Sequence, residues 1–125
     1  MNKPTILYVD DESVNLELFE ANLEDKYTVL TADNAITGLD IISKHNNLKV
    51  VISDMKMPQM NGIEFIKKAT LISPKAIFYI LTGFDITDEI KRALDTELIQ
   101  KYFRKPFNMN EISSEISRVL NDEKE

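Results

Sequence analysis

Short apolar runs alternate with longer segments of helical periodicity from one end of this 125-residue chain to the other. Three of the runs are almost continuously apolar, which is typical of parallel strands that are covered on both faces. No internal repeat or linker composition interrupts the alternation. The predicted strands are Ile6–Val9, Tyr27–Thr31, Lys49–Ser53, Ala76–Leu81 and Lys101–Phe103.

A repeated strand–helix order favours right-handed crossovers and a mostly parallel sheet. We therefore expect a single-domain α/β protein with a doubly wound, flavodoxin-like (βα)5 fold and strand order 2-1-3-4-5. Asn34 is predicted to cap the second helix, and Asn108 or Asn110 to cap the last one. We place the domain at residues 4–121 and a charged C-terminal tail at 122–125.

Composition excludes several classes of protein. No apolar run approaches the roughly 20 residues needed to span a bilayer, and the N-terminus lacks the apolar core of a signal peptide. The absence of cysteine excludes disulfide and thiolate–metal frameworks. A net charge of −6 argues against direct binding of nucleic acid through its phosphates. We expect a cytoplasmic domain that neither inserts into a membrane nor binds nucleic acid.

Carboxylates follow two of the predicted strands. Asp10 and Asp11 come directly after the first strand, and Asp54 comes after the third. Ligands of such folds sit beyond the carboxyl ends of the strands, at the switch point between strands 1 and 3, so these three side chains should converge there. Neighbouring carboxylates repel one another, and a hard cation such as Mg²⁺ compensates that repulsion with oxygen ligands alone.

The other two relevant strand ends are also polar. Thr82 ends the fourth predicted strand, with Gly83 beside it, and Lys105 stands before Pro106 after the fifth. A hydroxyl, an ammonium and a cation site together suit phosphoryl transfer, which needs mainly positioning and neutralisation of charge. Asp54 would then be the nucleophile that forms an acyl phosphate.

Four motifs, "ILYVDDES", "VVISDMKMPQMNGIEFI", "ILTG" and "YFRKPF", resemble in order and spacing those of response-regulator receiver domains of two-component signalling. The resemblance implies that Asp54 accepts a phosphoryl group. It also implies that Mg²⁺ is held by Asp11, Asp54 and the backbone carbonyl of Lys56, with Asp10 acting mainly through a metal-bound water. The remaining residues that it implies are Thr82 and Lys105 as phosphoryl contacts, and Tyr102 as the aromatic that follows Thr82 in the switch.

The resemblance further implies a signalling switch rather than a conventional enzyme. The phosphoryl donor would be a phosphohistidine of a histidine kinase or of a histidine phosphotransfer protein in a phosphorelay. The output surface would be helix 4, strand 5 and helix 5, acting on an unknown downstream effector. A homodimer formed on phosphorylation is compatible with this scheme.

Other functions remain as alternatives. A Mg²⁺-dependent phosphohydrolase of small substrates uses the same aspartyl phosphate, but the adjacent Asp10 and Asp11 do not match the D-x-D pattern of haloacid-dehalogenase-like enzymes. A flavodoxin-like FMN carrier needs a donor-rich phosphate loop where this chain has "DDES". A pseudo-receiver that is never phosphorylated is a third alternative. Taken singly, each residue also has an ordinary role in a cap, turn or surface.

Two departures from the family pattern carry expectations of their own. The stretch "ALDTELIQKYF" lacks the Gly-Ala turn that many receivers have before strand 5, so the join between helix 4 and strand 5 is not predicted. Phe84 and Lys56 each lie two residues beyond a site residue. We hypothesise that they hinder attack by water and lengthen the phosphorylated state.

Overall fold

Strands and helices alternate strictly in this computed structural model, which describes residues 3–83, 85–106 and 108–124. The elements in chain order are β1 (Thr5–Val9), α1 (Ser13–Leu23), β2 (Thr28–Ala32), α2 (Ala35–Lys44), β3 (Leu48–Asp54), α3 (Gly62–Ile72), β4 (Ile77–Thr82), α4 (Asp88–Asp95), β5 (Lys101–Arg104) and α5 (Met109–Lys124).

The five strands form one sheet in the order β2-β1-β3-β4-β5, and every neighbouring pair is parallel. This confirms the predicted fold class and strand order. The order places β1 beside β3, so the carboxyl ends of these two strands meet at the centre of one sheet edge. β5 has four residues and is a border strand, bonded to β4 alone.

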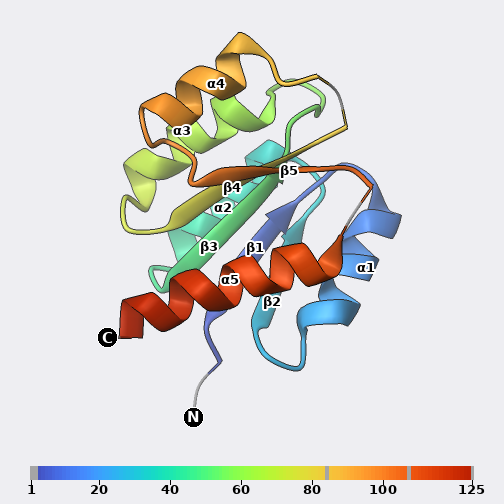
Figure 1. The fold of residues 1–125 in the computed structure, drawn as a ribbon, viewed down its shortest axis with the longest axis vertical. Helices are drawn as coiled ribbons and strands as arrows, with labels where there is room; N and C mark the ends of the chain where they lie inside the picture. The colour runs from blue at the N-terminus through green and yellow to red at the C-terminus, as the bar shows by residue number, and fades with distance from the viewer. Residues whose placement is uncertain (1–2, 84, 107, 125) are drawn as a thin grey trace.

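Helices cover both faces of the sheet, with α1 and α5 on one face and α2, α3 and α4 on the other (Figure 1). Successive side chains of a strand point to opposite faces, so each strand contributes to two cores. In β1, for example, Leu7 and Val9 pack under α2 and α3, whereas Ile6 and Tyr8 pack under α1 and α5. All four are fully buried.

Strand boundaries differ from the predicted ones by a single residue at most positions. The Tyr27 N–H donates to the Leu23 carbonyl at 3.0 Å and closes the end of α1, so β2 begins at Thr28. At the carboxyl ends of β3 and β4, the pairing between strands continues one residue beyond the apolar runs. Asp54 pairs with Leu81 and Thr82 with Arg104, so Asp54 and Thr82 are the last residues of strands rather than loop residues.

Side-chain caps begin most of the helices. Asn34 caps α2 by accepting from the Thr37 N–H, and Asn108 caps α5, as predicted. Asn61 and Glu64 form a reciprocal capping box at the start of α3. These caps fix where α2, α3 and α5 leave the sheet edge that carries the polar strand ends.

The join between α4 and β5 is a Schellman-type ending without glycine. Glu97 has a φ of 62°, in the left-handed region. Its N–H donates to the Leu94 carbonyl at 3.1 Å, and the Leu98 N–H donates to the Ala93 carbonyl at 2.9 Å. These bonds hold a non-glycine residue in a conformation that glycine adopts more easily.

The last helix continues to Lys124, into the stretch 122–125 that the sequence predicts as a charged tail. The domain limits of 4–121 stay a prediction. Among the described residues, none of the helices has both the length and the apolar character required to cross a membrane.

Replacing Gly62 with alanine should destabilise the fold strongly. A Cβ at this position would lie 2.5 Å from the Asp54 carbonyl oxygen and 2.7 Å from Ile80 Cδ1, at the start of α3. We expect a loss of about 2 kcal/mol or more, seen as a lower urea midpoint. Gly83→Ala is the matched control, since its Cβ would approach Lys105 no closer than 3.6 Å. Equal losses in both variants would contradict this account.

Glu97→Gly should stabilise the protein. The left-handed conformation strains a residue with a Cβ, while glycine costs some conformational entropy, so we expect a net gain of about 0.5–1 kcal/mol in urea unfolding. Glu97→Ala removes the same charge but retains the Cβ, and should give no such gain. A gain of equal size for alanine would instead assign the effect to the carboxylate.

Candidate functional site

Carboxylates converge where β1 and β3 end side by side. Asp10 and Asp11 follow β1, and Asp54 is the last residue of β3. One carboxylate oxygen from each of the three lies within 4.8 Å of the other two. Asp10 and Asp54 are buried, with 0% and 4% of their surface exposed, whereas Asp11 is exposed. The fold therefore brings the three predicted carboxylates together.

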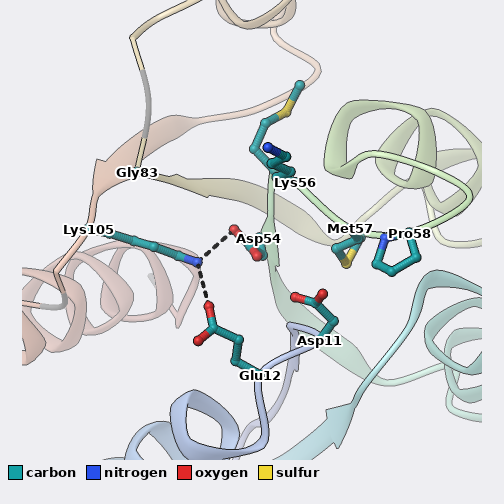
Figure 2. A pocket seen from close by; sticks show the side chains of 9 residues that line it. Asp11, Glu12, Asp54, Lys56, Met57, Pro58, Gly83 and Lys105 are labelled. Atoms are coloured by element: carbon teal, nitrogen blue, oxygen red, sulfur yellow. Dashed lines mark ion pairs between the residues drawn. The ribbon is translucent and has the colours of Figure 1, made fainter.

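A hollow of about 670 Å³ opens over this cluster. Figure 2 shows the side chains of Asp11, Asp54 and Lys105 around it, with Lys56 above Asp54. Asp11 comes from the β1–α1 loop, Asp54 from β3 and Lys105 from the β5–α5 loop. Gly83, directly after β4, contributes only its backbone to the lining. The lining thus draws on the ends of four strands.

Lys105 brings a positive charge to both buried carboxylates. Its Nζ lies 3.0 Å from Asp54 Oδ1, 3.8 Å from Asp10 Oδ2 and 4.0 Å from Glu12 Oε1. The Lys105 N–H donates to the Thr82 carbonyl at 2.9 Å, which fixes the start of the side chain beside the end of β4. The peptide bond between Lys105 and Pro106 is cis.

Asp10 is held by donors from three places in the chain. Its Oδ2 accepts from the Tyr8 hydroxyl on β1 and, at 3.0 Å, from the Asn15 side-chain amide on α1. Its Oδ1 accepts from the Glu12 N–H at 2.9 Å. Burial first, and then the hydrogen bond to Asp10, raise the pKa of Tyr8, so the phenol remains a donor. Asp10 is thus fixed in orientation.

Burial and neighbouring charges shift the pKa values of Asp54 and Lys105. Burial raises the pKa of Asp54 to about 6; contact with Lys105 opposes this shift, and the charges of Asp10 and Asp11 add to it. Burial alone would lower the pKa of Lys105, but the bond to Asp54 and the charges of Asp10 and Glu12 outweigh it, so that pKa is raised. Contact with Lys105 therefore does not offset the combined effect of burial and the neighbouring carboxylates on Asp54.

This donor set fits a hard divalent cation. Carboxylate oxygens from Asp10, Asp11 and Asp54 are close enough together to face one ion, and no nitrogen or sulfur ligand stands among them. Mg²⁺ binds through one or two carboxylates and retains several waters, and the open hollow has room for these. A cation would also supply the positive charge that Lys105 alone does not.

Thr82 and Tyr102 share the face of the sheet that α2, α3 and α4 cover. Thr82 is 1% exposed at the end of β4, and the described lining of the hollow includes neither residue. By strand alternation Thr82 points to the same face of the sheet as Ile80, which packs under α3 and α4. Tyr102 packs against that core too, with the Arg104 guanidinium 5.9 Å from its ring centroid. The pair shares a face, as a switch between them requires.

The structure describes only one of the two residues that we expect to slow hydrolysis of the phosphorylated state. Lys56 lines the hollow two residues beyond Asp54. Phe84 lies outside the described residues. The effect of either side chain on attack by water stays a prediction.

Tyr8, Glu12 and Asn15 are site residues that the sequence analysis did not single out. The signal for Tyr8 was available, because a residue two positions before Asp10 in a strand points to the same face as Asp10. Asn15 gave no such signal, since its contact depends on how α1 turns away from β1. Glu12 donates its backbone N–H to Asp10, as any residue except proline could, and its carboxylate lies 4.0 Å from Lys105 Nζ.

Residues 6–117 match the family model described as "Response regulator receiver domain". The chain is 31% identical over 121 residues to sporulation initiation phosphotransferase F of Bacillus subtilis, with 96% of each chain covered. It is also 31% identical over 118 residues to the transcriptional regulatory protein YesN of the same organism.

Solved structures agree with the sequence matches. A response regulator receiver domain protein from Clostridium thermocellum superposes with a TM-score of 0.88 at 35% identity, covering 96% of both chains. A CheY-like receiver domain protein from Methanospirillum hungatei gives a TM-score of 0.89 at 27% identity, covering 99% of this chain and 98% of that one.

The relatives differ in how much of them the chain spans. It covers 96% of the sporulation phosphotransferase but 32% of YesN and 31% of a cyclic di-GMP phosphodiesterase of Thermotoga maritima. The shared unit is therefore the receiver-like domain. The activities of the longer relatives belong to those proteins.

Replacing Asp54 with asparagine should stabilise the metal-free protein at neutral pH. The folded state raises the pKa of this carboxyl from 3.8 to about 6, so folded protein binds the proton more tightly than unfolded protein. Stability should therefore fall as pH rises from 4 to 6, and the asparagine variant should escape that loss. We expect it to be more stable by about 1–3 kcal/mol at pH 7 in urea unfolding with EDTA, with the gain vanishing near pH 4.

Asp40→Asn is the matched control for that experiment. Asp40 is an exposed aspartate of α2 whose carboxylate lies 3.0 Å from Lys44 Nζ. It should give no gain at pH 7. If Asp54→Asn were no more stable than the parent protein at pH 7, the buried charge of Asp54 would not be a net cost to the fold.

Proposed function

Because this chain belongs to the response regulator receiver domain family of two-component systems, we propose that it is a phosphoacceptor switch whose phosphorylated residue is Asp54. The observation that carries the proposal is the position of Asp54. It is a buried carboxylate at the end of a central strand, it faces an open hollow, and it contacts the ammonium of Lys105 at 3.0 Å.

The donor is a phosphohistidine of a histidine kinase or of a histidine phosphotransfer protein. An ionised oxygen of Asp54 attacks the phosphorus, and the bond between phosphorus and the imidazole nitrogen breaks. The electron pair of that bond returns to the imidazole, which takes up a proton, and the product on this chain is an acyl phosphate. With a pKa of about 6, Asp54 is mainly ionised at neutral pH and available as the nucleophile.

A divalent cation, Mg²⁺ by the chemistry of its ligands, would be held by Asp11, Asp54 and the backbone carbonyl of Lys56, with Asp10 behind them. When bound, it supplies positive charge for the incoming phosphoryl oxygens. Lys105 contributes a second positive charge from the opposite side of Asp54. Its Nζ lies 3.0 Å from Asp54 Oδ1. After phosphoryl transfer it would contact either the phosphoryl group or the remaining carboxylate oxygen.

The switch runs through Thr82 and Tyr102. The Thr82 hydroxyl turns towards the phosphoryl group as a donor, and Tyr102, on the same face of the sheet, occupies the space that this movement leaves. The surface formed by α4, β5 and α5 then changes for a downstream effector. The match to a phosphotransferase over almost its full length supports phosphoryl transfer as the chemistry, rather than hydrolysis of small substrates.

Incubation with phosphoramidate should add one phosphoryl group to the intact protein in the presence of Mg²⁺, measured by mass spectrometry. EDTA should abolish the gain because the carboxylate cluster then repels the donor. Asp54→Asn should not gain mass under any condition, whereas Asp40→Asn, which changes an exposed aspartate outside the hollow, should behave like the parent protein.

Two results would contradict the proposal. A gain of mass that survives in Asp54→Asn would place the phosphoryl group on another residue. No gain with phosphoramidate, and none with a panel of phosphorylated histidine kinases, would leave a binding module that is not phosphorylated.

A further inference from the structure

The donors around Asp10 point to a residue with a role beyond packing. We propose that Tyr8 is a positioning residue of the cation site: its hydroxyl holds the carboxylate of Asp10 in the orientation in which the three-carboxylate cluster binds Mg²⁺. The inference rests on the proposed function in one respect, namely that the cluster binds a divalent cation. It concerns how tightly this chain does so.

The first step is geometric. Tyr8 stands two positions before Asp10, so the two side chains leave the strand on the same face and the phenol reaches the carboxylate. Its hydroxyl donates to Asp10 Oδ2, the oxygen that Asn15 also contacts at 3.0 Å. The other oxygen, Oδ1, accepts from the Glu12 N–H. Rotation of the carboxylate would break bonds at both oxygens.

The second step is that Tyr8 is a rigid donor. The residue is 0% exposed, and its ring stacks on Phe19 of α1 with centroids 4.5 Å apart. It belongs to the core under α1 and α5, together with Ile52 and Phe103. A phenol that is packed on all sides cannot follow a moving partner, so the partner must stay where the phenol points.

The third step concerns the cation. Mg²⁺ demands near-ideal octahedral geometry with short bonds, so small displacements of its ligands or their neighbours reduce affinity. Removing a group that orients a metal-site carboxylate typically weakens binding by 10–100-fold. Because Asn15 and Glu12 would still hold Asp10 in part, we expect a change at the lower end of that range.

Titration calorimetry with MgCl₂ on the whole chain tests the inference. Tyr8→Phe removes the hydroxyl and retains the ring, and its dissociation constant for Mg²⁺ should rise by about tenfold. Tyr79→Phe is the matched control. Tyr79 is also 0% exposed, lies in the same core and donates to a buried carboxylate, Glu115, at 2.8 Å, but Glu115 does not belong to the three-carboxylate cluster.

Urea midpoints measured in EDTA separate positioning from stability. Both tyrosine variants should lose stability, since each leaves a buried carboxylate with one donor fewer, but only Tyr8→Phe should bind Mg²⁺ more weakly. The same replacement made in an Asp10→Asn background should have no further effect on affinity, because Tyr8 acts through the Asp10 carboxylate. If Tyr8→Phe fails to fold, Asn15→Leu, which removes the other side-chain donor to Oδ2, should weaken Mg²⁺ binding severalfold.

An unchanged or lower dissociation constant in Tyr8→Phe would overturn the inference, and an unchanged value in Asn15→Leu would do so in the second case. Either result, with the parent protein still binding Mg²⁺ and gaining a phosphoryl group, would leave the proposed function standing. If the parent protein bound no Mg²⁺ at all, the inference and the cation part of the proposed function would fall together.

Discussion

Mutual repulsion of carboxylates, two of them buried, is the constraint on which the rest of this site depends. Asp10 and Asp54 are buried, and Asp11 stands beside them. Charges in such a place persist only when donors or cations surround them. Lys105 provides a full positive charge at 3.0 Å from Asp54 Oδ1. The same ammonium lies 3.8 Å from Asp10 Oδ2, but Asp10 takes most of its compensation from hydrogen bonds at both carboxylate oxygens. Two neighbouring carboxylates are thus stabilised by different means.

That difference has a chemical meaning. Asp54 pairs with the Lys105 ammonium through Oδ1 and opens into the hollow, so the proposed nucleophile is accessible from solvent. Asp10 is bonded at both oxygens and has no exposed surface, which suits a residue that orients rather than reacts. The assignment of roles between adjacent acidic residues follows from what surrounds each one, because their side chains are chemically identical.

Much of this arrangement was predictable from the sequence. Alternation of apolar runs and helical periods predicted the sheet order correctly, and the rule for strand ends brought Asp10, Asp11, Asp54 and Lys105 to one edge. Strand limits were off by about one residue because hydrogen bonds, rather than polarity, end a strand. Asp54 is polar and is nevertheless the last paired residue of β3. The left-handed Glu97 was also unpredictable, since its conformation comes from the bonds that end α4.

Contacts between elements were the part that the sequence did not disclose. Asn15 reaches Asp10 only because α1 leaves β1 at a particular angle, and Tyr79 reaches Glu115 across 36 positions of the chain. Patterns along a sequence report faces and periods, not the distance between two faces once they are packed. The Tyr8 contact was predictable in part. The sequence indicates the face of the sheet to which Tyr8 points, but not that its hydroxyl reaches the Asp10 carboxylate.

The position of β5 has a mechanical consequence. This border strand is four residues long and bonded to one neighbour only, and Lys105 follows it by a single residue. A force on the lysine ammonium is therefore applied next to a short strand that is bonded on one side only. Asp54 thus ends a strand that is bonded on both sides, whereas the ammonium that pairs with it follows a strand that is bonded on one side only. Displacement at this sheet edge would spread outward along β5 before it disturbed the centre.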